Sequence, residues 1–157
     1  MIGFAGAHRS GKTTLARAAA QRLGRHFHDA SVTRIMKEAG VDGVADLPIP
    51  QRIAAQEFLL KRFVAELAKA PRPAITDRTP LDMIAYTLGE VTMHNTDAAT
   101  GRRIYAHVQH CLDETARHFE TIFVVRPLPQ FDADPSKPPD NQAYQWETQF
   151  LIEGAAN

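Results

Sequence analysis

The stretch that decides the fold is Gly6-Ala7-His8-Arg9-Ser10-Gly11-Lys12-Thr13. Residues 1–5 before it form a short apolar run typical of a buried strand. After it, Leu15, Ala19 and Leu23 share one face of a predicted helix, which we expect to end near Gly24. The stretch matches the pattern G-x-x-x-x-G-K-[S/T] in the context where that pattern functions, between a strand and a helix. The sequence therefore predicts a strand–loop–helix unit whose loop binds phosphate.

The chemistry of this loop predicts a purine nucleoside triphosphate, ATP, as cofactor together with Mg²⁺. Backbone N–H groups at a helix N-terminus form a concave site for anions, and glycines let the backbone approach the phosphates. We expect Lys12 to bridge the β- and γ-phosphates and Thr13 to ligate Mg²⁺. Thr14 is a candidate contact for the α-phosphate. His8 and Arg9 occupy variable positions of the pattern, so each is either a ligand contact or simply exposed.

Working outward from the loop, strands and helices alternate along the chain. This alternation predicts an α/β fold of three layers, with a mostly parallel sheet and helices on both faces. We predict one domain over residues 1–157. The pattern of the segment 142–157 is compatible with a helix or a short strand, and it suits a helix better. The expected strands are 1–5, 25–29, 74–77 and a buried strand at 121–125, and the expected helices are 31–39, 51–69, one starting at Pro80, and 101–119.

Composition excludes several classes of protein. The chain has 157 residues, of which 44% are apolar, and it contains no apolar run of the ~20 residues that a membrane span requires. It begins without a secretory signal, so we expect a cytoplasmic protein that does not bind membranes. The single cysteine, Cys111, excludes an intrachain disulfide and is expected in the core. Eighteen basic and eighteen acidic residues cancel, so nucleic-acid contact would have to be local.

Two aspartates follow predicted strands, at the edge where parallel sheets bind ligands. Asp77 is the candidate that holds the magnesium shell. It could instead cap the next helix, but Thr79, followed by Pro80, fits that role better. Asp29 is our choice for the general base, although Asp77 could also accept a proton. Arg78 is a candidate for phosphate recognition, with a structural ion pair as the alternative.

The segment 126–141 is rich in proline and aspartate and is predicted to be a lid that excludes water from the phosphates. Its cations, Arg126 and Lys137, either neutralise the transferred group or are solvated. The helix around Gln56 and Phe58 is a candidate border of an acceptor pocket, since bases stack on aromatic rings and pair with amides. Phe58 is more often a core residue in such a pattern.

Three stretches, FAGAHRSGKTTLA (4–16), DRTPLDMIAY (77–86) and FVVRP (123–127), resemble small P-loop kinases over most of the chain. The sequence is similar to the thymidylate-kinase-like and nicotinamide-riboside-kinase-like group, often encoded by bacteriophages, and most closely to the phage 5-hydroxymethyluracil DNA kinases. The resemblance implies a Rossmann-like P-loop NTPase fold. It also implies phosphorylation of a base in DNA, giving 5-phosphomethyl-deoxyuridine. It also implies that Asp77-Arg78 is the family's D-R motif. The lid lacks the paired arginines of many nucleotide kinases, and no clear fifth strand follows it.

Other functions remain open at this point. A kinase for a free nucleoside or deoxynucleoside monophosphate differs from a DNA-base kinase only in the size of its acceptor. An NTPase switch acting on a partner is a different class, and the absence of a second carboxylate after Asp77 argues against it. For a DNA acceptor, Arg72, Arg102 and Arg103 are candidates for a small basic rim. The sequence leaves the oligomeric state open.

Overall fold

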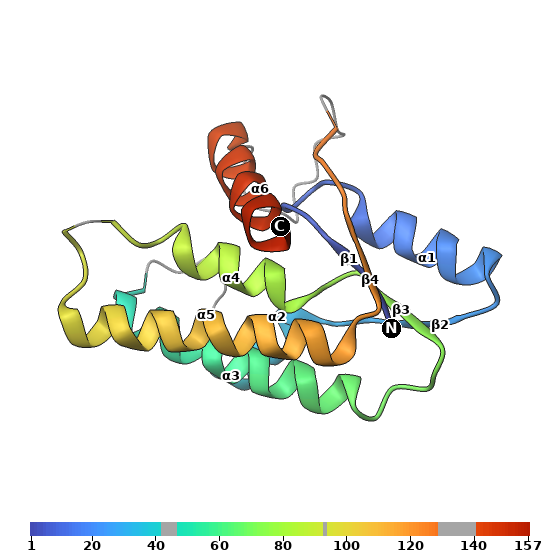
Figure 1. Cartoon of the computed structure of the whole chain (residues 1–157), viewed down its shortest axis with the longest axis horizontal. Helices are drawn as coiled ribbons and strands as arrows, with labels where there is room; N and C mark the ends of the chain where they lie inside the picture. Colours follow the sequence, from blue (N-terminus) through green and yellow to red (C-terminus); the bar gives the residue numbers. More distant parts are fainter. Residues whose placement is uncertain (42–46, 93, 129–140) are drawn as a thin grey trace.

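The computed structural model describes residues 1–41, 47–92, 94–128 and 141–157 (Figure 1). Its centre is a parallel sheet in the order β2-β3-β1-β4. The two central strands are neighbours, with Ile2 opposite Ile75 and Gly3 opposite Thr76. The α/β fold predicted for a P-loop NTPase is confirmed. The strands are β1 (Ile2–Ala5), β2 (His26–His28), β3 (Ala74–Thr76) and β4 (Thr121–Val124).

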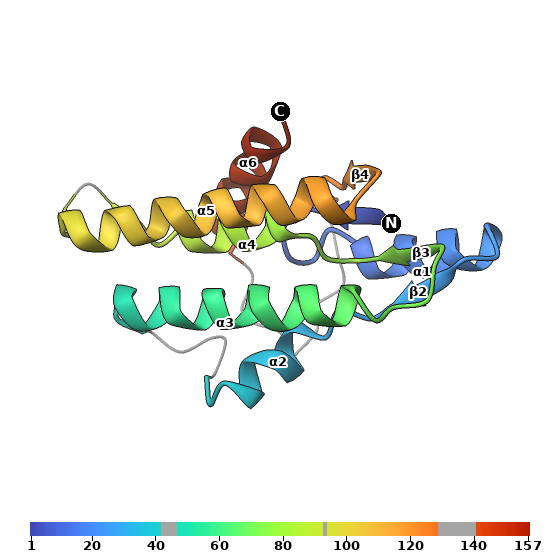
Figure 2. The ribbon, with the colours of Figure 1, turned by 60° about the horizontal axis from the view of Figure 1, so that its bottom comes forward.

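Helices cover both faces of the sheet, as Figures 1 and 2 show. α1 packs on one face, through a cluster that includes Phe4, Ala16, Ala20 and Ile75. α3, α4 and α5 form a layer on the other face, and α6 lies beside α4. The helices described are α1 (Lys12–Arg22), α2 (Val32–Glu38), α3 (Ile49–Leu67), α4 (Pro80–Leu88), α5 (Ala98–His118) and α6 (Gln142–Ala156).

Local signals at the helix starts explain most of these boundaries. Thr79 and Asp82 form a capping box at the start of α4, with Pro80 as the first helical residue. α5 starts earlier than the predicted 101, because the Asp97 side chain accepts the Thr100 N–H and caps three residues ahead of the apolar stripe. At α6, the Asn141 side chain accepts the Tyr144 N–H in the same way, and the segment forms a helix rather than a strand.

Two expectations about burial are wrong. Leu15 of α1 and Leu23, the residue after it, are exposed. The buried face of α1 is formed by Lys12, Ala16 and Ala20, because the small alanine side chains let this helix lie close to the sheet. The strand predicted as buried, β4, is an edge strand, paired with β1 alone among the described strands. One of its faces is therefore incompletely covered, and Phe123 remains 51% exposed although its ring contacts that of Phe4.

The core lies mainly between the sheet and the layer of α3, α4 and α5. Phe63, Leu60 and Leu67 are buried there, as the periodicity of α3 predicts, whereas Phe58 is partly buried. Cys111 is fully buried, and burial raises the pKa of its thiol to about 12, so it is a core residue as expected. Over the described parts of the chain, no helix is both long and apolar enough to cross a membrane.

Candidate nucleotide-binding site

The phosphate loop runs from the end of β1 to the start of α1, and its backbone requires the two glycines of the motif. Gly6 has φ +152°, and a Cβ atom there would lie 2.3 Å from the Val125 carbonyl oxygen. Gly11 has φ +81°, in the left-handed region that side chains disfavour. Arg9 also has positive φ, at 57°. The loop therefore curves back over the N-terminus of α1, where the N–H groups of residues 12–14 have no intrahelical acceptor.

Lys12 is the buried cation of the site. Its side chain lies under the loop, and Nζ donates hydrogen bonds of 2.6 Å to the carbonyl oxygens of Gly6 and Ala7. The pKa of Lys12 is lowered from 10.5 to about 8, chiefly because burial removes solvent from the ammonium and also because the Arg78 cation is near, while Asp82 and Asp77 oppose the shift. The ammonium is thus held by neutral carbonyls in a poorly solvated position, where an anionic phosphate oxygen would be a stronger partner.

Thr13 and Asp77 meet across the site. The Thr13 hydroxyl donates a 2.5 Å hydrogen bond to Asp77 Oδ2, although the two residues are 64 positions apart. Asp77 is 8% exposed and follows β3 directly. Among the described residues no group of three or more acidic, histidine or cysteine side chains forms a metal site. One hydroxyl and one carboxylate oxygen fit Mg²⁺, which takes few protein ligands and keeps waters and substrate phosphates in its shell.

Arg78 and Asp82 lie at the start of α4, beside the loop. Asp82 Oδ1 accepts the Gly6 N–H at 3.3 Å, and Asp82 Oδ2 accepts the Thr79 N–H and hydroxyl. The Arg78 guanidinium lies 3.6 Å from Asp82 Oδ1. The Asp82 carboxylate, 2% exposed, therefore connects the helix cap, the loop and Arg78. The capping-box spacing identified Thr79 and Asp82 as a helix start, but nothing in the sequence indicated that Asp82 also contacts the loop.

Asp29 lies at the rim instead of inside the site. Its side chain is 60% exposed and accepts a 2.8 Å hydrogen bond from Arg17, whose guanidinium also lies over the Phe27 ring. Burial lowers the pKa of the neighbouring His28, and both Asp29 and Asp77 act against that shift. His28 therefore interacts electrostatically with both carboxylates. The fold brings Asp77 into hydrogen-bond contact with the loop and leaves Asp29 at its border.

The predicted lid falls largely outside the described residues, and Lys137 lies in the part that is not described. Arg126 is described, and its guanidinium makes a bidentate pair with Glu153 of α6, at 2.8 and 3.2 Å. Arg126 could therefore neutralise the transferred phosphoryl group only after its ion pair with Glu153 breaks.

Three of the remaining predicted residues, His8, Ser10 and Thr14, lie in the loop or directly after it, whereas Gln56 lies in α3. Ser10 is 3% exposed, and no described residue hydrogen bonds to its hydroxyl, so it is a candidate ligand contact. The His8 ring contacts Tyr144 of α6. Thr14 is exposed in the first turn of α1, where an α-phosphate contact remains a prediction. Gln56 is 6% exposed, with no described partner for Oε1.

The arginines proposed as a basic rim are separated by the fold. Arg72 precedes β3, whereas the loop contacts the residue that follows this strand, so Arg72 lies at the opposite edge of the sheet. The phosphate loop and Arg72 therefore lie at opposite ends of β3. Arg103 pairs with Glu57 of α3 through both of its carboxylate oxygens. Arg102 is exposed near the start of α5.

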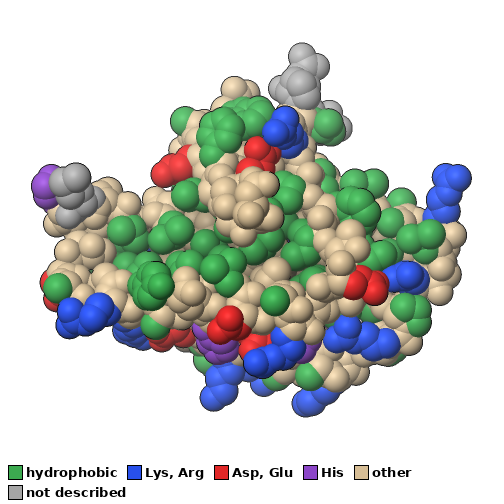
Figure 3. All heavy atoms as spheres, viewed as in Figure 1, with side chains coloured by type: hydrophobic (Ala, Val, Ile, Leu, Met, Phe, Trp, Pro, Cys, Tyr) green, Lys and Arg blue, Asp and Glu red, His purple; other side chains and the backbone are tan. Residues whose placement is uncertain are grey.

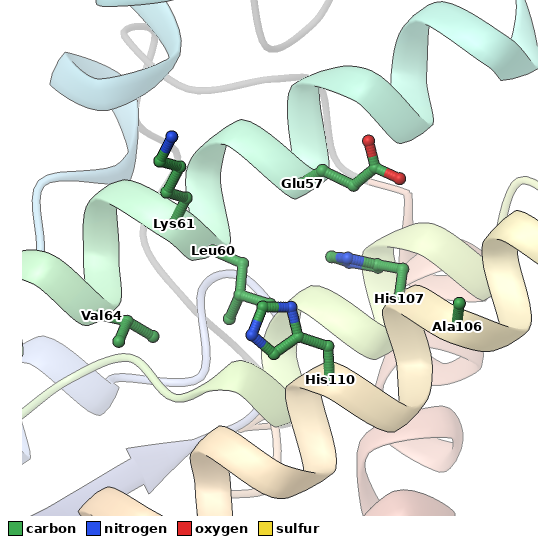
Figure 4. Close-up of a pocket in the computed structure, with 7 residues that line it drawn as sticks. All are labelled: Glu57, Leu60, Lys61, Val64, Ala106, His107 and His110. Atoms are coloured by element: carbon green, nitrogen blue, oxygen red, sulfur yellow. The ribbon is translucent and has the colours of Figure 1, made fainter.

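The groove between α3 and α5 is a second hollow, of about 480 Å³. Figure 4 shows His107 and His110 pointing from α5 toward α3, with Leu60 and Val64 on the opposite wall. The pKa of His107 is lowered by burial. All of the lining residues belong to these two helices, so the groove shares no residue with the phosphate loop.

Besides the Asp82 contact, sequence reasoning missed two residues of α6 that contact the loop, Gln145 and Gln149. Gln149 Oε1 accepts the Ala7 N–H at 3.0 Å, and Gln145 Nε2 donates to the His8 carbonyl oxygen at 2.7 Å. A signal was present in the sequence, because two glutamines spaced four apart share a helix face with Ile152. The sequence alone did not indicate that this face of α6 packs against the phosphate loop.

The parallel sheet, the glycine loop, Lys12 and the Thr13–Asp77 pair together define a P-loop nucleotide-binding domain. A family model described as an AAA domain matches residues 1–156. The chain therefore belongs to this AAA-domain family, whose P-loop chemistry is NTP hydrolysis or phosphoryl transfer. No curated protein matches the chain.

Proposed function

We propose that the protein is an ATP-dependent kinase that transfers the γ-phosphoryl group to a hydroxyl of a nucleoside-type acceptor, with 5-hydroxymethyluracil in DNA as the preferred acceptor. We favour phosphoryl transfer over NTP hydrolysis because of the identity of the residue that follows Asp77. It is Arg78, a cation that lies within electrostatic range of Lys12. A hydrolytic site needs a group that orients water, and a carboxylate after the strand aspartate would suit that task, whereas an arginine suits anionic groups.

In the proposed reaction, the acceptor hydroxyl oxygen attacks the γ-phosphorus, the bond from that phosphorus to the β–γ bridging oxygen breaks, and ADP leaves. The hydroxyl proton passes to a carboxylate. Mg²⁺, when bound, would neutralise charge on the phosphates. Lys12 would stabilise the transferred charge, and Asp77 would orient the Thr13 hydroxyl. We assign the proton to Asp29, which lies at the carboxyl end of the neighbouring strand, with Asp77 as the alternative.

The acceptor side of the proposal is supported by polar groups between α3 and α4. The ion pair of Arg52 with Glu90, at 3.5 Å, joins the start of α3 to the end of α4. Gln56 lies one helical turn after Arg52 in α3, and no described residue hydrogen bonds to its Oε1. An amide oxygen of this kind suits a ligand with hydrogen-bond donors at a planar edge, such as a pyrimidine.

A DNA acceptor does not require a strongly basic protein if a single extruded base is read. The face seen in Figure 3 carries basic and acidic side chains interspersed, in keeping with the balanced charge of the chain. Binding that depends on one flipped base rather than on many phosphates should be only weakly sensitive to salt. This gives the DNA proposal a second measurable consequence.

The deciding experiment follows labelled γ-phosphate from ATP to three acceptors: DNA containing 5-hydroxymethyluracil, the free nucleoside, and its monophosphate. We expect label on the DNA, and none with the Lys12→Ala variant as the matched control. Label on a free acceptor alone would replace the DNA kinase with a nucleoside or nucleotide kinase. Release of inorganic phosphate without any labelled acceptor would contradict the kinase proposal and favour an NTPase switch.

A further inference from the structure

Helix α6 contacts the phosphate loop through buried side-chain amides. Gln149 is fully buried, and its Oε1 accepts the Ala7 N–H. Gln145 is 3% exposed and donates to the His8 carbonyl oxygen. These bonds join residues 142 and 137 positions apart in the sequence. They are tertiary contacts between α6 and the loop, separate from the strand–loop–helix unit.

The orientation of the Gln149 amide is fixed by its second partner. Its Nε2 donates to Glu153 Oε1 at 2.9 Å, and a carboxylate oxygen can only accept such a bond. The amide oxygen must therefore face Ala7, whose N–H can only donate. A buried amide needs partners for both ends, and here both are supplied. Packing alone would be served by an apolar side chain, so the glutamine at this place is explained by its bond to the loop.

The backbone of Ala7 is held at both of its polar groups, which belong to the two peptide units that flank its Cα atom. Gln149 binds the N–H of Ala7, and Lys12 Nζ binds its carbonyl oxygen. When Lys12 turns toward a phosphate, its bond to the Ala7 carbonyl weakens, whereas the bond from Gln149 does not depend on the lysine. Gln149 can thus keep the loop in its binding geometry while Lys12 changes partner, which is the condition for a preorganised anion site.

The Gln149 amide is also connected, through Glu153, to Arg126, the first residue of the predicted lid. Glu153, which accepts the Gln149 Nε2 bond, also binds the Arg126 guanidinium through both carboxylate oxygens. A continuous path therefore runs from the Ala7 backbone through Gln149 and Glu153 to Arg126. Each link is a hydrogen bond of at most 3.2 Å. Chains of this kind can transmit a change at one end to the other.

We propose that Gln149 is a positioning residue of the phosphate loop, and that its bond to Glu153 couples the shape of the loop to the position of Arg126. The inference rests on nucleotide binding at the loop and not on the identity of the acceptor. It therefore stands or falls separately from the proposed kinase activity, and its tests measure backbone exchange and ADP affinity.

The first test replaces Gln149 with methionine, which has a similar length and no amide. Without nucleotide, we expect faster hydrogen–deuterium exchange in a peptide spanning residues 3–10. The affinity for ADP should fall about tenfold, because the loop loses its fixed geometry. The matched control is Thr148→Val, which removes the partly buried bond from the Thr148 hydroxyl to the Tyr144 carbonyl within α6, a bond that includes no atom of the loop. If Gln149→Met behaves like Thr148→Val in both measurements, the positioning role is wrong.

A folding failure of Gln149→Met would be recognised by its thermal melt, and Gln145→Met then takes its place, since it removes the other bond to the loop. Hydrogen–deuterium exchange and ADP affinity are then measured for Gln145→Met. Faster exchange in residues 3–10 and weaker ADP binding support it, and values equal to those of Thr148→Val overturn it.

The coupling is tested by a double-mutant cycle with Arg126→Gln. If the path through Glu153 operates, Arg126→Gln should weaken ADP binding in the wild-type background and have a smaller effect once Gln149 is methionine. If Arg126 acts on the nucleotide directly or not at all, its effect will be the same in both backgrounds. Additivity would therefore overturn the coupling while leaving the positioning role intact.

Discussion

Asp77 and Asp29 make an instructive pair, because both directly follow strands that are neighbours in the sheet. Asp77 is 8% exposed and accepts a hydrogen bond from Thr13 of the phosphate loop. The Asp29 side chain is 60% exposed and pairs with Arg17 on the surface. The sequence context of the two residues is similar, whereas their surroundings in the folded chain differ.

The difference follows from the order of the strands. β3 lies between β2 and β1, so the residue after it meets the loop that leaves β1. β2 is an edge strand, and the residue after it meets α1 on one side and solvent on the other. The carboxylate at the centre of the sheet therefore lies against the phosphate loop, and the one at the edge lies at the surface.

The largest effect is expected for Lys12→Ala, at the centre of the Asp77 side of the site. Phosphoryl transfer should fall by about 10³-fold or more, since a buried cation at the transferred phosphate is lost. The variant should still fold, because Lys12 contacts the loop and not the apolar core. Single-turnover phosphoryl transfer measures the loss of activity, and far-ultraviolet circular dichroism shows whether the variant folds. Transfer at the wild-type rate would refute the assignment of the loop.

The next effect concerns stability against pH. The pKa of Lys12 is about 8 in the folded chain and 10.5 in the reference state, so between these values the unfolded state binds more protons. The free energy of unfolding should therefore increase as the pH rises through this window, by about 3 kcal/mol for a shift of this size. Urea unfolding from about pH 7.5 to 10 measures it.

Lys12→Ala supplies the reference for that pH series. The difference between wild type and variant should change across the window, because the other titrating groups are common to both. A difference that stays constant with pH would show that burial does not depress the pKa of this lysine.

Asp77→Asn should lower turnover by about 10²-fold at saturating Mg²⁺, since the amide keeps the shape but not the charge of the group that positions the metal ligand Thr13. Turnover is measured over a range of Mg²⁺ concentrations. Wild-type turnover in this variant would reduce Asp77 to a structural hydrogen-bond acceptor and remove the contrast with Asp29.

The smallest effect is expected at the edge strand. Asp29→Asn should lower kcat about tenfold, because a general base late in the reaction contributes less than charge stabilisation. Arg17→Ala is the matched control, and since exposed ion pairs contribute ~0–1 kcal/mol, it should change stability by less than about 1 kcal/mol. An Asp29→Asn variant with an unchanged kcat would transfer the role of base to Asp77.

Local sequence signals predicted those parts of the site that lie close together in the chain. The pattern of residues 6–13 requires particular backbone angles, and Gly6 and Gly11 adopt them. The spacing of Thr79, Pro80 and Asp82 predicts a helix start, and α4 begins there. The sequence could not predict which face of α1 is buried, because alanine and leucine both fit an apolar face, and the close approach to the sheet favours alanine.

By itself, then, the sequence determined the α/β class, the phosphate loop and the residue types available for chemistry, since these depend on backbone angles and periodicity within short segments. Only the tertiary structure decided which carboxylate meets the loop, that Arg72 lies at the opposite edge, and that Gln145 and Gln149 hold the loop. Those outcomes depend on strand order and on the docking of α6, which bring together residues up to 142 positions apart. Contacts at such separations are set by packing, and no pattern within a single segment specifies them.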